Sequence, residues 1–133
     1  TWLFDSLLLA SLAMPLTARD SDDHAPAQKQ TAAARLLAAD KPEKALLIYE
    51  TLVATEPDNA DYLTGLGKAQ LQDHKALAAS RTLREVIDNH PNYEPAYPLL
   101  QQAYYASGQS ERAFGILQQA RERFGEQAWM QDN

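Results

Sequence analysis

The chain has 133 residues, a length typical of one domain, and 45% of them are hydrophobic and 23% charged. Its formal net charge is −6 and it has no cluster of lysines and arginines, which excludes a nucleic-acid-binding protein, because such proteins concentrate positive charge against phosphates. The sequence contains no cysteine, so disulfides, cysteine-ligated zinc and thiol nucleophiles are excluded together.

Residues 1–18 form an apolar segment unlike the rest of the chain. Between Trp2 and Leu16 only one aspartate, two serines and one proline interrupt the apolar run. The composition is that of a secretory signal cleaved after Ala18, but no lysine or arginine precedes the run and Asp5 stands where positive charge belongs. A membrane span is the second interpretation, although the run covers about 22 Å as a helix, less than the roughly 30 Å hydrocarbon core.

Three roles for this apolar segment therefore stay open: a membrane anchor or part of one, a helix docked on a partner protein, and a helix packed on the rest of the chain. The large apolar side chains that would make the membrane or partner contact are Trp2, Leu3, Phe4, Leu7, Leu8, Leu9 and Leu12.

Residues 19–27, RDSDDHAPA, form a short acidic linker that we expect to be solvated. Asp22, Asp23 and His24 could touch a metal ion. Three adjacent polar residues in a linker are more often simply soluble, so we expect no metal site there.

Residues 28–127 repeat one pattern with a step of 34 residues. Ala45, Ala79 and Ala113 are spaced by this step. The same step relates three large apolar positions and three helix-breaking positions, namely Tyr49, Leu83 and Leu117, and Pro57, Pro91 and Gly125. Each unit therefore predicts two amphipathic helices joined by a tight turn and ended by a proline or glycine.

A 34-residue period with these residues resembles the tetratricopeptide repeat. Leu66-Gly67, the three alanines, Tyr49, Pro57 and Pro91 carry the resemblance. It implies an all-α, right-handed superhelical solenoid of helix-turn-helix units at about 26–59, 60–93 and 94–127. We expect Leu46, Tyr49 and Leu52 to be buried against their own first helix and the next repeat, because a helix pair cannot hide its apolar face alone.

Two local features add expectations. In the first helix of the third repeat, Pro98 is expected to lie deep enough to remove a backbone hydrogen bond and kink the helix. Residues 128–133 look like the start of a further helix. Trp129 and Met130 there would cover the last repeat, either as a capping helix or as the first turn of more repeats.

No catalytic constellation is present in the sequence. His74 and His90 have no partner at helical spacing, and the GLGK stretch at 65–68 fails as a phosphate loop because Tyr62 and Ala69 occupy required positions. We therefore expect a protein that is not an enzyme and uses no cofactor.

The resemblance implies a concave groove, lined by the first helix of each repeat, that binds peptides or protein segments. The groove residues on this sequence would be Gln30, Ala34, Leu37, Thr64, Lys68, Leu71, Gln102 and Tyr105. This nearly neutral surface suits an extended or helical segment with apolar anchors. Family members that clamp a C-terminal carboxylate carry lysine, asparagine and arginine at positions that are here Gln30, Ala34, Gly65, Pro95 and Leu99. None of these matches.

The sequence predicts a non-catalytic scaffold. Its organisation resembles small bacterial envelope proteins that assist assembly of pili, secretion machines or cytochromes, which implies a membrane-associated protein of the periplasm or inner membrane. A structural subunit that docks through residues 2–16 and a soluble regulatory module of a longer protein are the alternatives.

Overall fold

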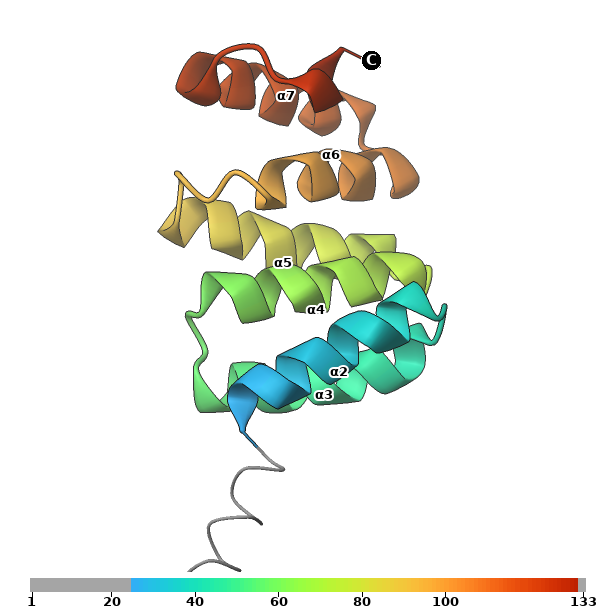
Figure 1. Cartoon of the computed structure of the whole chain (residues 1–133). Coiled ribbons are helices and arrows are strands. Elements are labelled where there is room, and N and C mark those ends of the chain that lie inside the picture. Colours follow the sequence, from blue (N-terminus) through green and yellow to red (C-terminus); the bar gives the residue numbers. More distant parts are fainter. Residues whose placement is uncertain (1–24, 132–133) are drawn as a thin grey trace, which may run out of the picture.

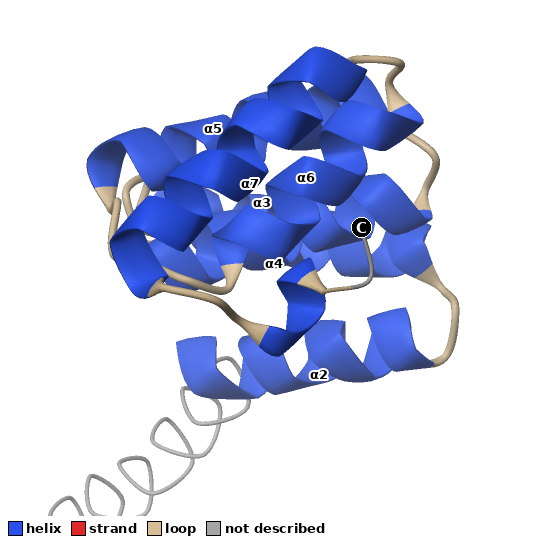
Figure 2. Ribbon diagram, turned by 90° about the horizontal axis from the view of Figure 1, so that it is seen from above, coloured by secondary structure: helices blue, strands red, loops and turns tan. Residues whose placement is uncertain are grey.

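Helices make up all the regular structure of residues 25–131, which are the residues that this computed structural model describes (Figure 2). The elements are α2 (Pro26–Ala38), α3 (Pro42–Thr55), α4 (Ala60–Gln72), α5 (Ala76–Asn89), α6 (Ala96–Ala106), α7 (Ser110–Phe124) and a short 3-10 turn, η1 (Ala128–Met130). They follow one another along a stack, with α2 and α3 at one end and α7 at the other (Figure 1). The expected all-α solenoid is confirmed.

The helices form three pairs, and each pair has an A helix (α2, α4, α6) and a B helix (α3, α5, α7). Every helix packs against the next one in the chain. The A helices also contact one another, α2 with α4 and α4 with α6, whereas the B helices make no comparable contact with each other. The stack therefore curves, with A helices close together on its concave side and B helices splayed on its convex side.

The turn inside each pair has one geometry, repeated at the 34-residue step. Asp40, His74 and Gly108 have φ of 55°, 60° and 77°, the left-handed region. In the second pair the His74 amide donates to the Leu71 carbonyl and the Lys75 amide to the Gln70 carbonyl, and the other two turns repeat both bonds. These two bonds satisfy carbonyls that the end of the A helix leaves unpaired. The tight turns expected inside the units are thus helix stops of one kind.

Apolar side chains gather in two clusters that meet at α4. The smaller cluster holds Leu37, Leu46, Tyr49 and Leu52 with part of α4, and the larger one extends from Leu63 to the C-terminal end. Partly buried Val53 packs against both. The first pair therefore has a core of its own that is joined to the rest through α4.

The crossing points of the helices require small residues. Ala45, Ala79 and Ala113 are fully buried. A Cβ at Gly67 would lie 2.6 Å from Leu83 Cγ, and one at Gly65 would overlap the Tyr49 ring. Since these two partners are equivalent residues of α3 and α5, α4 is held closely from both sides.

The third A helix differs from expectation at its start. An extra turn at 93–95 delays α6, which begins at Ala96, so Pro98 is its third residue. Amides in the first turn of a helix have no partner within that helix. Pro98 therefore removes no hydrogen bond there, and the expected kink was wrong.

Met130 of η1 is fully buried in the larger cluster, and Trp129 packs against that cluster. The apolar segment 1–18 and most of the acidic linker lie outside the described residues. Within residues 25–131, no helix is long and apolar enough to cross a membrane.

Candidate binding groove

The expected groove residues fall into three rows across the A helices, each with a 34-residue step. Ala34, Lys68 and Gln102 form the middle row, and all three are exposed. They lie on α2, α4 and α6, the helices that contact one another on the concave side. The middle row is therefore a continuous accessible strip across the stack.

Four of the five residues in the two flanking rows are less accessible than expected. Leu37 is 6% exposed because it belongs to the smaller core cluster, and Thr64 is 8% exposed. Gln30 and Leu71 are half-buried. Leu37 and Thr64 therefore offer almost no surface to a partner and act in packing.

Tyr105, the flanking-row residue at the end of α6, is an accessible aromatic side chain beside the strip, with 47% of its surface exposed. Helix α6 carries no charged residue, and Lys68 is the cation of the middle row. The accessible strip and Tyr105 together thus offer one cation, one amide and one aromatic ring.

Beside the strip, Tyr93 links the second pair to the third. Its hydroxyl donates a hydrogen bond to Asp61 Oδ1, on the first turn of α4. Burial, this hydrogen bond and the charge of Asp61 raise the pKa of Tyr93 to about 12, and the neighbouring Thr64 hydroxyl opposes them. Tyr93 also lies beside Thr64, which helps to explain why Thr64 is buried.

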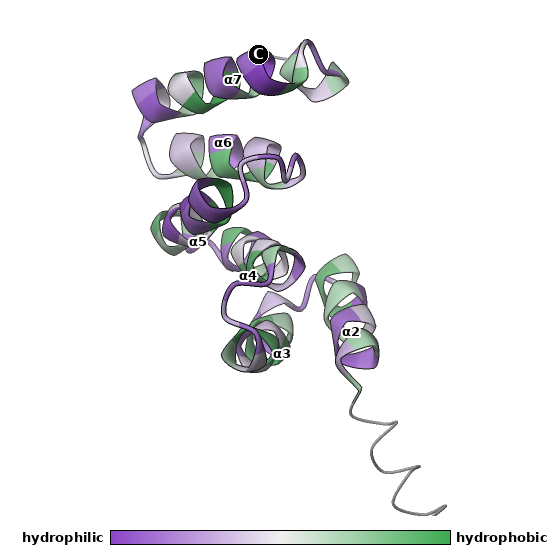
Figure 3. Ribbon diagram, turned by 90° about the vertical axis from the view of Figure 1, so that its left-hand side faces the viewer, coloured by the Kyte–Doolittle hydropathy of each residue, from purple (hydrophilic) through white to green (hydrophobic). Residues whose placement is uncertain are grey.

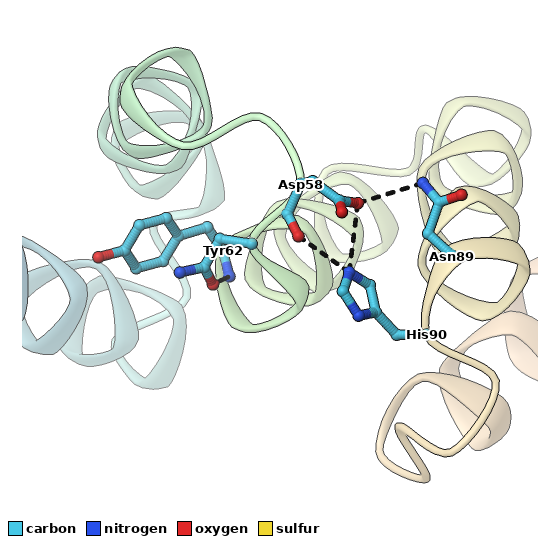
Figure 4. Close-up of polar contacts among 5 residues, drawn as sticks. Asp58, Tyr62, Asn89 and His90 are labelled. Atoms are coloured by element: carbon cyan, nitrogen blue, oxygen red, sulfur yellow. Dashed lines mark hydrogen bonds and ion pairs between the residues drawn. The ribbon is translucent and has the colours of Figure 1, made fainter.

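Polar contacts connect the loops of successive repeats. Asn89 Nδ2 donates to Asp58 Oδ1 at 3.2 Å, and His90 Nε2 lies 2.9 Å from the Asp58 carbonyl oxygen (Figure 4). One step of 34 residues later, Arg123 Nη1 donates to Asn92 Oδ1 at 3.0 Å. Each contact ties the end of a B helix to the loop after the preceding B helix, which fixes neighbouring repeats relative to each other.

Asn59 starts α4 with a side-chain cap. Its Oδ1 accepts a hydrogen bond from the Tyr62 amide at 3.0 Å, and its Nδ2 donates to Glu56 Oε2 at 2.8 Å. The cap satisfies one amide that the helix start leaves open. The cap therefore sets where α4 begins, and Lys68 is a residue of that helix.

Gln101 departs from the repeat pattern. It occupies the position of Ala33 and Gly67 and is 5% exposed, and its Nε2 has no hydrogen-bond partner among the described residues. A buried amide without a partner costs roughly 1–3 kcal/mol. The mismatch of a polar residue with a small-residue position was the signal that could have flagged it.

The histidines within the described range have structural contacts. His74 forms the turn after α4, and His90 contacts Asp58. Among residues 25–131 no three metal-ligating side chains come together.

Comparison with known proteins agrees with this architecture. The profile of the tetratricopeptide repeat family matches residues 36–103, slightly more than half of the chain and two periods of 34 residues. No curated protein sequence matches the chain significantly.

Several solved structures share the fold. The Sgt2 TPR domain from Aspergillus fumigatus superimposes with a TM-score of 0.74 at 17% identity, covering 80% of this chain and 72% of that one. A thermophilic TPR protein from Thermus thermophilus gives 0.72 at 21% identity, covering 80% and 60%. A mutant of MamA gives 0.67 at 16% identity, covering 83% and 60%. The 34-residue pattern, the paired helices and the profile match lead to one conclusion: the chain belongs to the tetratricopeptide repeat family.

Proposed function

We propose that this protein is a non-catalytic scaffold that holds a segment of another protein in its concave groove. TPR proteins are in general protein–protein interaction modules, which gives the coarse function. The exposed row of Ala34, Lys68 and Gln102, with Tyr105 at its side, carries the specific proposal. It is the accessible part of the concave side.

The chemistry of the strip defines the segment that would fit. Tyr105 offers an aromatic surface for an apolar anchor, and Gln102 can both donate to and accept from a peptide backbone. Lys68 adds one cation. An extended or helical segment with an apolar side chain and a nearby acceptor is the best match.

Photo-crosslinking in the native cell tests this groove, with probes placed singly at Lys68 and Gln102. A discrete protein adduct from both positions is expected, and Tyr105→Ala should reduce it while leaving the helical circular dichroism unchanged. Leu47→Ala is the matched control, because Leu47 is 66% exposed on α3, a B helix. Capture that survives Tyr105→Ala undiminished would contradict the groove.

We further propose that residues 2–16 attach the scaffold to a bacterial inner membrane, with the repeats on the periplasmic side, where it assists assembly of an envelope complex. The apolar run from Trp2 to Leu16 and the polar linker after it support this. A probe at Leu8 separates the alternatives. Lipid adducts support an anchor, whereas a protein adduct that deletion of residues 1–18 abolishes, without change in solubility, supports a docking helix.

A further inference from the structure

A second surface lies on the convex side, between α5 and α7. Because these B helices are splayed, they leave two adjoining hollows of about 530 Å³ and 360 Å³. Both hollows share Arg84, Tyr104 and Arg112, with Tyr104 contributed by α6 between the two B helices. We call these joined hollows the arginine cleft. Its walls belong to the B helices, so it is separate from the groove of the proposed function.

Positive charge is concentrated in this cleft although the whole chain is acidic. Three of the seven arginines of the chain line it: Arg81, Arg84 and Arg112. Arg81 and Arg112 make no ion pair or hydrogen bond with any described residue. Arg84 uses only its Nε, 3.1 Å from Asp88 Oδ1, which leaves its terminal nitrogens available.

The charges are arranged unevenly along the cleft. Glu85 and Asp88 line only the smaller hollow, on the α5 side. The larger hollow is lined by Arg84 and Arg112 with Gln119 and has no acidic residue in its wall. Hydrophilic residues run along α5 and α7 in Figure 3. The larger hollow is thus where an incoming carboxylate would meet two guanidinium groups.

Gly115 lines the larger hollow. It lies in the middle of α7, where glycine costs about 1 kcal/mol of helix stability relative to alanine. A Cβ at this position would meet nothing within 4 Å, so helix packing does not require glycine here, unlike at Gly67. Glycine at this position therefore adds no side chain to the α7 wall of the larger hollow.

We propose that the arginine cleft is a docking site for an acidic segment of a partner protein, with a carboxylate placed between Arg84 and Arg112. Charge complementarity identifies the occupant. The two hollows are open and share three lining residues, which suits an extended chain rather than an enclosed small ligand. Nucleic acid is disfavoured, since a polyanion would be repelled by the acidic chain and by Glu85 and Asp88.

The test measures peptide binding to the full chain by fluorescence anisotropy. The probes are labelled peptides of about ten residues, which extend about 33 Å, with Asp or Glu placed among Leu, Phe and Ala in varied order. Each has a counterpart in which Asn or Gln replaces every acid. We expect acidic peptides to bind, their amide counterparts to bind about tenfold more weakly, and the affinity to fall with added salt.

Variants locate the site. Arg112→Glu should weaken binding by about tenfold, because it replaces an attraction by a repulsion. Gly115→Phe should block the hollow, whereas Gly115→Ala should not. Arg35→Glu on α2 is the matched charge reversal at an exposed arginine outside the cleft, and it should leave affinity unchanged. Tyr105→Ala should also leave the affinity for the acidic peptide unchanged. A negative result for the cleft can therefore be distinguished from a negative result for the groove.

Four outcomes would overturn the proposal. In the first two, no acidic peptide binds, or the amide counterparts bind as tightly as the acidic peptides. In the third, Arg112→Glu leaves the affinity for the peptide unchanged. In the fourth, inorganic phosphate or a single-stranded oligonucleotide at equal concentration displaces the peptide. Self-association of the chain that Arg112→Glu abolishes would assign the cleft to a second copy and likewise overturn a partner segment.

Discussion

At the scale of single residues, two glycines in helix interiors have opposite roles. Gly67 faces fully buried Leu83, which has no room to move away from an added Cβ, whereas Gly115 faces open space. Gly67→Ala should therefore lower the free energy of unfolding, because overpacking of roughly 1–3 kcal/mol exceeds the helix gain of about 1 kcal/mol. Gly115→Ala should raise it by about 1 kcal/mol. Urea unfolding measures both, and a stabilised Gly67→Ala variant would mean that α4 and α5 are not held at this spacing.

Tyr93 provides a prediction about pH. Its pKa of about 12 lies above the 10.0 of a free tyrosine, so the folded protein retains the phenol proton more strongly than the unfolded chain. The resulting stabilisation is complete below pH 10 and is lost as pH rises from about 10 to about 12. Asp61→Asn should lower the pKa of Tyr93 but leave the effect of burial.

Nuclear magnetic resonance of ring-labelled tyrosine measures this titration, and Tyr93→Phe assigns the signal. An unchanged midpoint in Asp61→Asn would mean that the hydrogen bond to Asp61 is absent in solution.

At the scale of helices and turns, three different residues adopt the same left-handed conformation. Asp40, His74 and Gly108 end their A helices identically, but a residue with a Cβ pays a steric cost there that glycine does not. His74→Gly should therefore raise stability by roughly 1 kcal/mol, and Gly108→Ala should lower it by a similar amount. Thermal unfolding of both variants gives the comparison. Destabilisation by His74→Gly would point to a contact of the imidazole beyond its role in the turn.

The sequence predicted the helices and turns well because a 34-residue period reports the same packing three times. Pro57 and Pro91 stop α3 and α5, and the alanines mark the crossings. It failed at Pro98, because the extra turn after Tyr93 changes the start of α6 without changing the period. Periodicity counts residues and does not register where within its unit a helix begins.

The exposure of the expected groove residues could be predicted only in part, for a related reason. The pattern places the middle row on the concave side, because its residues occupy the same position in each of the three A helices. It could not place Leu37 and Thr64, because their burial depends on particular neighbours: the core of the first pair for Leu37, and Tyr93 of the next loop for Thr64. Neighbours of this kind come from the tertiary packing and have no signature in the period.

At the scale of the whole molecule, the division of the core at α4 sets how the stack loses structure. A solenoid is stabilised by each repeat and by its interfaces with neighbours only, so its ends can open separately. The first pair depends on the smaller cluster, in which Leu52 is 2% exposed. Residues of α6 such as Leu100 belong to the larger cluster.

Leu52→Ala should therefore lower the free energy of unfolding by about 2–5 kcal/mol, and the loss should destabilise mainly the first pair. Amide hydrogen exchange is expected to accelerate in α2 and α3 while α6 keeps its protection. Leu100→Ala, which removes the same side-chain atoms, should accelerate exchange in α6 and α7 instead. Uniform acceleration in both variants would contradict independent opening and would mean that Val53 and α4 couple the two clusters into one cooperative unit. In that case the groove forms or is lost as a whole. With independent opening, the strip around Gln102 and Tyr105 persists after the first pair has opened.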